Sequence, residues 1–109
     1  MLLPKRKRFL NKKHLKFVAS HPCCIKQFSN DCQGGVQAHH LLKPYDGIRG
    51  MGLKAGDNNS VPLCQYHHAR LHDGFGNEDK FWELYGLNPE YGRGLAELLY
   101  KRFLEDELN

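Results

Sequence analysis

One stretch of the chain decides the fold, and it reads Cys64-Gln65-Tyr66-His67-His68-Ala69-Arg70-Leu71-His72. Cys64 and His67 are separated by two residues, which is the spacing of a zinc knuckle. Residues four apart share one face of a helix, so the imidazoles of His68 and His72 can bind one ion. Successive helix positions point about 100° apart. A helix that begins near residue 65 therefore directs His67 to one metal site and His68 with His72 to another.

The site of Cys64 and His67 needs two further ligands from upstream. Cys32 is one, and either Cys23 or Cys24 is the other, with Cys23 favoured. Thiolates are soft donors that select zinc, and a closed set of three cysteines and one histidine is typical of a structural site. A buried free thiol is the alternative for whichever of Cys23 and Cys24 is not a ligand. A disulfide is disfavoured because the chain has the features of an intracellular protein.

The second site takes its remaining residues from His39-His40, at the end of an expected strand. Successive side chains of a regular strand face opposite ways, so both histidines can address one site only if the backbone bends there. A strand that enters a glycine-rich loop permits such a bend. One histidine would then join His68 and His72 at the metal. The other could deprotonate water, because imidazole exchanges protons close to neutral pH.

The remaining pattern predicts one α+β domain over residues 1–109. A basic helix over 12–20, capped by Asn11, is followed by a strand over 36–42, a glycine-rich loop over 43–58 and a strand over 59–64. The helix over 65–73 ends at Gly74. A further helix begins at Asn77 and ends near Gly86, and the last begins with Asn88 as N-cap and Pro89 as first residue. We divide the chain into a basic arm and helix over 1–22, a core over 23–74 and a helical extension over 75–109.

Apolar spacing predicts which helical residues face the core. Trp82, Tyr85 and Tyr91 could stack on nucleic-acid bases, but aromatic residues at helical spacing indicate packing. The residues expected in the core are Leu15, Val18 and Ala19 of the first helix and Leu95, Leu98, Leu99 and Phe103 of the last.

Charge is distributed unevenly along the chain. Residues 1–54 carry 11 Lys and Arg against 2 Asp and Glu, whereas residues 55–109 carry 5 against 10. Clustered cations favour a polyanionic partner, because neutralised phosphates release their counterions. For Lys5–Arg8 alone, a solvated tail without a ligand is the alternative. No apolar run is long enough to span a bilayer and no signal peptide follows Met1, so we expect a cytoplasmic protein without membrane contact.

Several of these segments together resemble the HNH, or ββα-metal, endonucleases. They are Ala38-His39-His40-Leu41, Asn59 and Cys64-x2-His67-His68-x3-His72. Small phage and prophage nucleases, including the recombination-enhancement (Ref-type) nucleases that act with RecA, are similar in four more segments, and the likeness covers residues 21–75. The chain departs from the family at its first knuckle, where eight residues rather than two separate Cys23 from Cys32. The four segments are Pro22-Cys23-Cys24, Gly50-Met51-Gly52-Leu53-Lys54, Asp57 and Val61-Pro62-Leu63-Cys64.

The resemblance implies two antiparallel strands and a helix around one divalent ion, that is, a ββα-metal core with a structural zinc knuckle, flanked by a basic N-terminal helix and two C-terminal helices. It implies that His40 is the general base and that His39, His68 and His72 hold the catalytic metal. Asn59 would brace the loop that carries the base. The implied cofactors are structural zinc and one catalytic zinc, manganese, nickel or magnesium ion.

The implied activity is a DNA endonuclease or nickase of low sequence specificity, active in phage or prophage DNA recombination or processing in a bacterial host cell. The alternative is a zinc-stabilised module that binds nucleic acid and cuts nothing. A recombinase filament as partner and RNA as substrate stay open. Four cations near the expected site would contact the DNA backbone without reading bases: Lys43, Arg49, Lys54 and Arg70.

Overall fold

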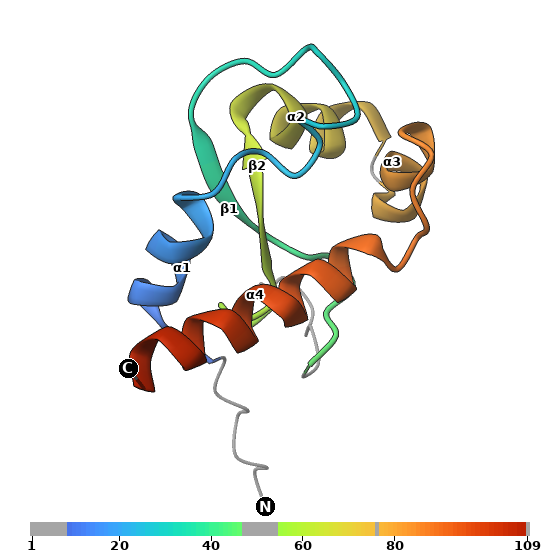
Figure 1. Cartoon of the computed structure of the whole chain (residues 1–109). Coiled ribbons are helices and arrows are strands. Elements are labelled where there is room, and N and C mark those ends of the chain that lie inside the picture. The colour runs from blue at the N-terminus through green and yellow to red at the C-terminus, as the bar shows by residue number, and fades with distance from the viewer. Residues whose placement is uncertain (1–8, 47–54, 76, 109) are drawn as a thin grey trace, which may run out of the picture.

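Two strands and four α-helices form the part of the chain that the computed structural model describes, residues 9–46, 55–75 and 77–108 (Figure 1). The coarse prediction of an α+β protein, with the sheet and the helices in this order, is confirmed. The elements are α1 (Lys12–Ala19), β1 (Val36–His40), β2 (Ser60–Cys64), α2 (Gln65–Arg70), the π-helical turn η1 (Leu71–Phe75), α3 (Glu78–Leu84) and α4 (Tyr91–Leu108).

The two strands pair antiparallel, with Val36 opposite Cys64 and His40 opposite Ser60. Every residue of β2 is buried, because α1, α2 and α4 all contact this strand. β1 ends at His40, two residues before the predicted end. The next residue, Leu41, still donates its N–H to the carbonyl of Asn59 (2.9 Å), and the N–H of Leu42 donates to the Glu78 carboxylate (3.0 Å).

Helix α1 begins where predicted, since the Asn11 side chain accepts the N–H of His14 (3.0 Å). The prediction of its buried face was only partly right. Val18 and His14 are fully buried, whereas Leu15 and Ala19 are half-buried. The His14 ring takes the core position because it packs against two aromatic rings of α4, at centroid distances of 5.1 Å (Tyr100) and 5.0 Å (Phe103).

Helices α2 and α3 follow the prediction with small shifts at their ends. Gly74 does not end the first of them, because the chain continues through η1 as far as Phe75. Gly86 does follow the end of α3, and its positive φ of 75° turns the chain so that the N–H of the next residue, Leu87, reaches the carbonyl of Trp82 (3.0 Å). This turn reverses the chain before α4.

The start and the core face of α4 correct two predictions. The helix begins at Tyr91 rather than Pro89, because the Asn88 side chain accepts the N–H of Glu90 (2.8 Å) and closes a turn first. Leu98 was expected in the core but is 45% exposed. The buried residues of the helix are Gly92, Ala96, Leu99 and Phe103.

The core lies between the sheet and the helices, and Trp82 and Phe81 of α3 are its largest members. Tyr85 and Tyr91 are partly buried and pack against it, in agreement with a packing role for these aromatics. Among the described helices, none combines the length and the apolar character needed to cross a membrane.

Candidate metal centres

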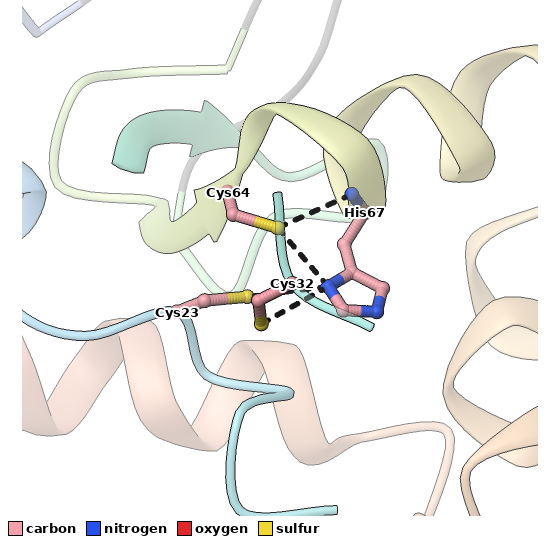
Figure 2. A group of neighbouring side chains, drawn as sticks. All are labelled: Cys23, Cys32, Cys64 and His67. Atoms are coloured by element: carbon pink, nitrogen blue, oxygen red, sulfur yellow. Dashed lines mark hydrogen bonds between the residues drawn. The ribbon is translucent and has the colours of Figure 1, made fainter. Parts of the chain in front are cut away.

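Three cysteines and one histidine converge at the start of α2 (Figure 2). Each of Cys23, Cys32, Cys64 and His67 offers one ligand atom, and these atoms lie within 4.8 Å of one another. His67 Nδ1 is 3.6 Å from Cys23 Sγ, 3.6 Å from Cys32 Sγ and 3.2 Å from Cys64 Sγ. Tetrahedral zinc, with Zn–S near 2.3 Å and Zn–N near 2.0–2.1 Å, separates sulfur from nitrogen by about 3.6 Å. The cluster therefore has the donors and the spacing to hold a metal ion such as zinc.

Local structure explains how distant residues reach this cluster. Cys64 ends β2 and caps α2, where its Sγ accepts the N–H of His67 (3.4 Å). Cys23 is positioned by its neighbour Cys24, whose N–H donates to the carbonyl of Pro62 (2.9 Å). Cys32 is held from the other side, since Tyr66 N–H donates to the carbonyl of Gln33 (3.0 Å).

The choice between Cys23 and Cys24 is decided by this arrangement. Cys23 belongs to the cluster and Cys24 does not. Burial raises the pKa of the Cys24 thiol well above its usual value. Cys24 is therefore buried beside the cluster but is not one of its four candidate ligands.

The electrostatics of the cluster favour a bound cation. Burial, followed by the nearby Cys23 and Cys64, raises the pKa of Cys32 to about 12. Burial also acts against ionisation of Cys64, but hydrogen bonds from the backbone N–H groups of His67 and Gln33 outweigh it and lower the pKa of that thiol. Several thiolates so close together repel one another, and a divalent cation would offset that repulsion.

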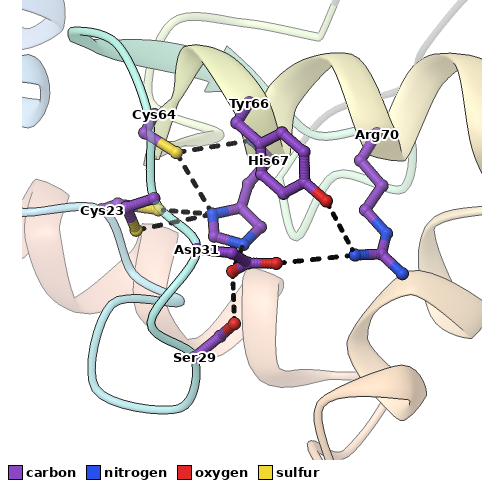
Figure 3. A network of polar contacts seen from close by, with 8 residues as sticks. Cys23, Ser29, Asp31, Cys64, Tyr66, His67 and Arg70 are labelled. Carbon is purple, nitrogen blue, oxygen red and sulfur yellow. Dashed lines mark hydrogen bonds and ion pairs between the residues drawn. The ribbon is translucent and has the colours of Figure 1, made fainter.

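A carboxylate fixes the histidine of this cluster (Figure 3). His67 Nε2 lies 2.8 Å from Asp31 Oδ1, so Nε2–H can donate to Asp31 while Nδ1 faces the three sulfurs. Asp31 is itself held by the Ser29 hydroxyl and lies 3.6 Å from Arg70 Nη1. The hydrogen bond from Ser29, with that from His67, keeps the pKa of Asp31 below its usual value despite burial. No local sequence pattern pointed to Asp31, which is 36 residues from His67.

Three histidines form a second cluster, and they come from β1 (His39), α2 (His68) and η1 (His72). The ligand atoms of His39, His68 and His72 lie within 4.8 Å of one another. His68 Nε2 and His72 Nε2 are 3.2 Å apart, and the His39 ring centroid is 5.1 Å from that of His68. His39 is buried, His68 half-buried and His72 exposed, so this cluster opens to solvent on one side. Three ligands with an open side are typical of a metal site that also binds substrate.

Glu78, the first residue of α3, holds the buried histidine of this second cluster. Its Oε2 lies 2.9 Å from His39 Nε2 and also accepts the N–H of Leu42 (3.0 Å). Nδ1 is then the nitrogen that His39 can offer to an ion. No local pattern in the sequence pointed to this contact, because His39 and Glu78 are 39 residues apart.

His40 lies outside both clusters. The expected backbone bend at His39-His40 is absent, because β1 pairs regularly through His40 and the two side chains face opposite sides of the strand. His40 Nε2 instead lies 2.8 Å from Asp57 Oδ1, and Asp57 Oδ2 accepts the N–H of Asn11 (2.7 Å). Asp57 thus orients the His40 ring, a contact that the sequence analysis did not foresee.

Asn59 is fully buried and ties β2 to the chain that follows β1. Its Oδ1 accepts the N–H groups of Tyr45 (2.9 Å) and Asp46 (3.1 Å). Its Nδ2 donates to the carbonyl of Asp46 (3.0 Å). This geometry is compatible with the bracing role that the resemblance implies.

Two of the four cations expected to contact DNA, Lys43 and Arg70, belong to the described residues, and they have different partners. Lys43 pairs with Asp79 of α3, with Nζ and Oδ2 2.5 Å apart, and remains 56% exposed. Arg70 lies beside the cysteine-containing cluster, where its Nη1 donates to the Tyr66 hydroxyl (3.1 Å). Arg49 and Lys54 lie outside the described residues.

Fold and clusters together define a small α+β protein with a Cys3His group able to hold a metal ion such as zinc. The chain belongs to the family described as a protein of unknown function (DUF968), whose model matches residues 1–100. It is 40% identical over 83 residues to the uncharacterized protein YdfU of Escherichia coli (strain K12). That match covers 74% of this chain but only 22% of the relative. No solved structure matches the chain.

Proposed function

We propose that this chain is a metal-dependent DNA endonuclease of the HNH type, which nicks or cuts phosphodiester bonds. The observation that carries the proposal is the meeting of His39, His68 and His72, from two distant segments, with ligand atoms within 4.8 Å of one another. The neighbouring strand residue His40 is a second, separately oriented histidine. A module that only binds nucleic acid has no evident use for all four.

The donor set fits a catalytic divalent cation. Three imidazoles suit zinc, nickel or manganese better than magnesium, which prefers oxygen ligands. When bound, the ion would supply charge neutralisation at the scissile phosphate and at the leaving 3′-oxygen. Glu78 would keep His39 in the orientation that presents one nitrogen to the ion.

His40 would act as general base by taking a proton from the attacking water. Its Nε2 is engaged with Asp57, which leaves Nδ1 as the proton acceptor. Because His39 and His40 face opposite sides of β1, this role requires the scissile phosphate to lie where it reaches both the histidine cluster and the attacking water beside His40 Nδ1. Asn59 would brace the chain that follows β1.

The closed cluster of Cys23, Cys32, Cys64 and His67 would hold structural zinc. All of its ligands except Cys32 are buried, so it has no open side like that of the histidine cluster. The charge imbalance of residues 1–54 supports DNA as the partner, with phosphate contacts rather than base readout. A cytoplasmic role in phage or prophage recombination, with or without a RecA-type filament, belongs to this proposal.

A nicking assay tests the proposal. Supercoiled plasmid is incubated with the protein and Mg²⁺, Mn²⁺ or Zn²⁺, with EDTA as the metal-free control and structured RNA as a parallel substrate. We expect metal-dependent nicking that His40→Ala lowers by about 10²–10⁴-fold. The matched control is His21→Ala, which changes a half-buried histidine outside both clusters. DNA binding without nicking in any metal would instead favour the non-catalytic module.

A further inference from the structure

A groove of about 570 Å³ runs between α4 and the segment that follows α1. Its apolar lining includes Pro22, Pro62, Leu95 and Leu98, and its cations include Lys26 and Arg102. None of the described residues that line it is acidic. Lys26 and Arg102 are exposed and form no ion pair with the described part of the chain. The groove therefore suits an apolar side chain that is accompanied by negative charge.

The last turns of α4 have the complementary character. Glu105, Asp106 and Glu107 are exposed and form no ion pair within residues 9–46, 55–75 and 77–108. Leu108 beside them is 87% exposed. This end of the helix lies at the edge of the molecule, so another chain can approach it (Figure 1).

The exposed side of α4 that carries Leu98 of the groove also carries one of these acids, Glu105. Leu98, Lys101, Glu105 and Leu108 follow one another at intervals of three, four and three residues, which places them on one stripe with the spacing of a coiled-coil seam. Lys101 is 67% exposed, and its Nζ lies 3.7 Å from Glu97 in a surface pair that contributes little. The stripe thus begins and ends with an exposed leucine and has opposite charges between them.

We propose that two copies of this chain associate through this stripe, with their α4 helices antiparallel. A two-fold axis beside residue 103 sets Leu98 opposite Leu108 of the second copy. The same register sets Lys101 opposite Glu105 of the second copy. Each contact occurs twice because a two-fold interface is self-complementary. The Leu108 side chain enters the groove next to Leu98, and the acids near it meet Arg102 and Lys26.

Other occupants fit the same face less well. A nucleic-acid backbone would gain nothing from the apolar floor and would be repelled by Glu105 to Glu107. A basic segment would be repelled by Lys26 and Arg102. One helix pair is smaller than the roughly 1,200–2,000 Å² of stable complexes, so we expect a dissociation constant in the micromolar range.

Analytical ultracentrifugation of the whole chain at about 5–500 µM tests this, independently of any nuclease activity. We expect a reversible monomer–dimer equilibrium. Lys101→Glu or Glu105→Lys alone places like charges opposite each other and raises the dissociation constant about tenfold or more. The double variant Lys101→Glu/Glu105→Lys restores the dissociation constant to within about threefold of that of the unaltered protein. The control is Lys80→Glu, an exposed change on α3, which leaves it unaltered.

Circular dichroism confirms that each surface variant is folded. A chain that stays monomeric throughout this range would overturn the proposal and leave the groove to a different molecule. A dimer that neither single variant weakens, or that the double variant fails to restore, would overturn it as well.

Discussion

His39 Nε2 and Glu78 Oε2 lie 2.9 Å apart, and their side chains are only 1% and 2% exposed. The same relationship occurs at two further histidines, where Asp31 holds Nε2 of His67 and Asp57 holds Nε2 of His40, each at 2.8 Å. In each pair the carboxylate engages Nε2 of the histidine, which leaves Nδ1 to bind a metal ion or to accept a proton. The carboxylates are therefore as much a part of the candidate sites as the histidines themselves.

The Glu78 contact predicts an effect on the histidine cluster. In Glu78→Gln, a neutral amide replaces the carboxylate, so His39 becomes a weaker and less well oriented donor. We expect divalent-cation affinity at this cluster to fall about 10- to 100-fold, measured by calorimetry with Mn²⁺. The matched control is Glu83→Gln, an exposed change on the same helix. Equal affinities in Glu78→Gln and the unaltered protein would contradict the prediction.

Asp31 predicts a corresponding effect on the Cys3His cluster. In Asp31→Asn, His67 loses the charged partner of Nε2, and the zinc site should lose its ion to a chelator about 10- to 100-fold more readily. A colorimetric chelator measures the release. Asp106→Asn, which removes an exposed carboxylate far along α4, should release zinc at the rate of the unaltered protein. If Asp31→Asn also released zinc at the rate of the unaltered protein, His67 would not need the Asp31 carboxylate to bind zinc.

Removal of the structural metal should unfold the core. Cys64→Ser keeps an oxygen that can cap α2 but loses a thiolate ligand, so the loss can be assigned to the metal rather than to the cap. We expect the protein to contain about one zinc less per chain and to lose its cooperative thermal transition. Cys24→Ala, at the buried cysteine outside the cluster, should retain its zinc. Metal analysis together with calorimetry measures both quantities.

Two glycines of α4 predict opposite effects on stability. A Cβ at Gly92 would lie 2.8 Å from Cζ2 of Trp82, so Gly92→Ala should destabilise the fold by about 1–3 kcal/mol. A Cβ at Gly94 would meet nothing within 4 Å, and Gly94→Ala should stabilise the helix by about 0.5–1 kcal/mol. Urea unfolding compares the two variants. Equal effects would mean that α4 does not pack against Trp82 through Gly92.

His14 predicts a dependence of stability on pH. Burial lowers its pKa below the usual 6.5, although the charge of Asp57 acts in the opposite direction. As the pH falls through 6.5, the unfolded chain takes up a proton there that the folded protein does not yet accept. The free energy of unfolding should therefore decrease from this point until the lower folded-state pKa is passed. His14→Leu should lose less stability between about pH 7.5 and about pH 5.5 in urea unfolding.

For each protein, the measured quantity is the difference between its free energies of unfolding at the two pH values. A change in packing that His14→Leu causes equally at both pH values therefore cancels. Neither nitrogen of the His14 ring has a hydrogen-bond partner among the described residues, which is why protonation inside the fold is unfavourable. A variant that loses as much stability as the unaltered protein would show that His14 does not control the effect.

Local patterns allowed part of the molecule to be predicted from the sequence. The directions of His67, His68 and His72 follow from helix geometry alone, and Asn11 marks the start of α1 through its own side chain. Local sequence favoured Cys23 over Cys24 but could not decide between them. The decision depends on how a long loop folds back onto β2.

The carboxylate partners could not be predicted because tertiary folding makes those pairs. Glu78 is 39 residues from its histidine, Asp31 is 36 residues away and Asp57 is 17 residues away, so no spacing rule joins them. The core position of His14 and the exposure of Leu98 were missed for a similar reason. Which face of a helix is buried depends on the elements that it meets, and small rotations exchange neighbouring residues.

One helix carries both His67 and His68, on neighbouring faces. Both clusters can therefore form only if the number of residues between Cys64, His67, His68 and His72 is kept. One inserted residue between His67 and His68 would turn the second pair by about 100° and carry it away from His39, while Cys64 and His67 kept their spacing. Substitutions along α2 can be tolerated wherever the side chain is exposed, but changes in its length cannot. The length of this segment is therefore as strict a requirement as the identity of any ligand.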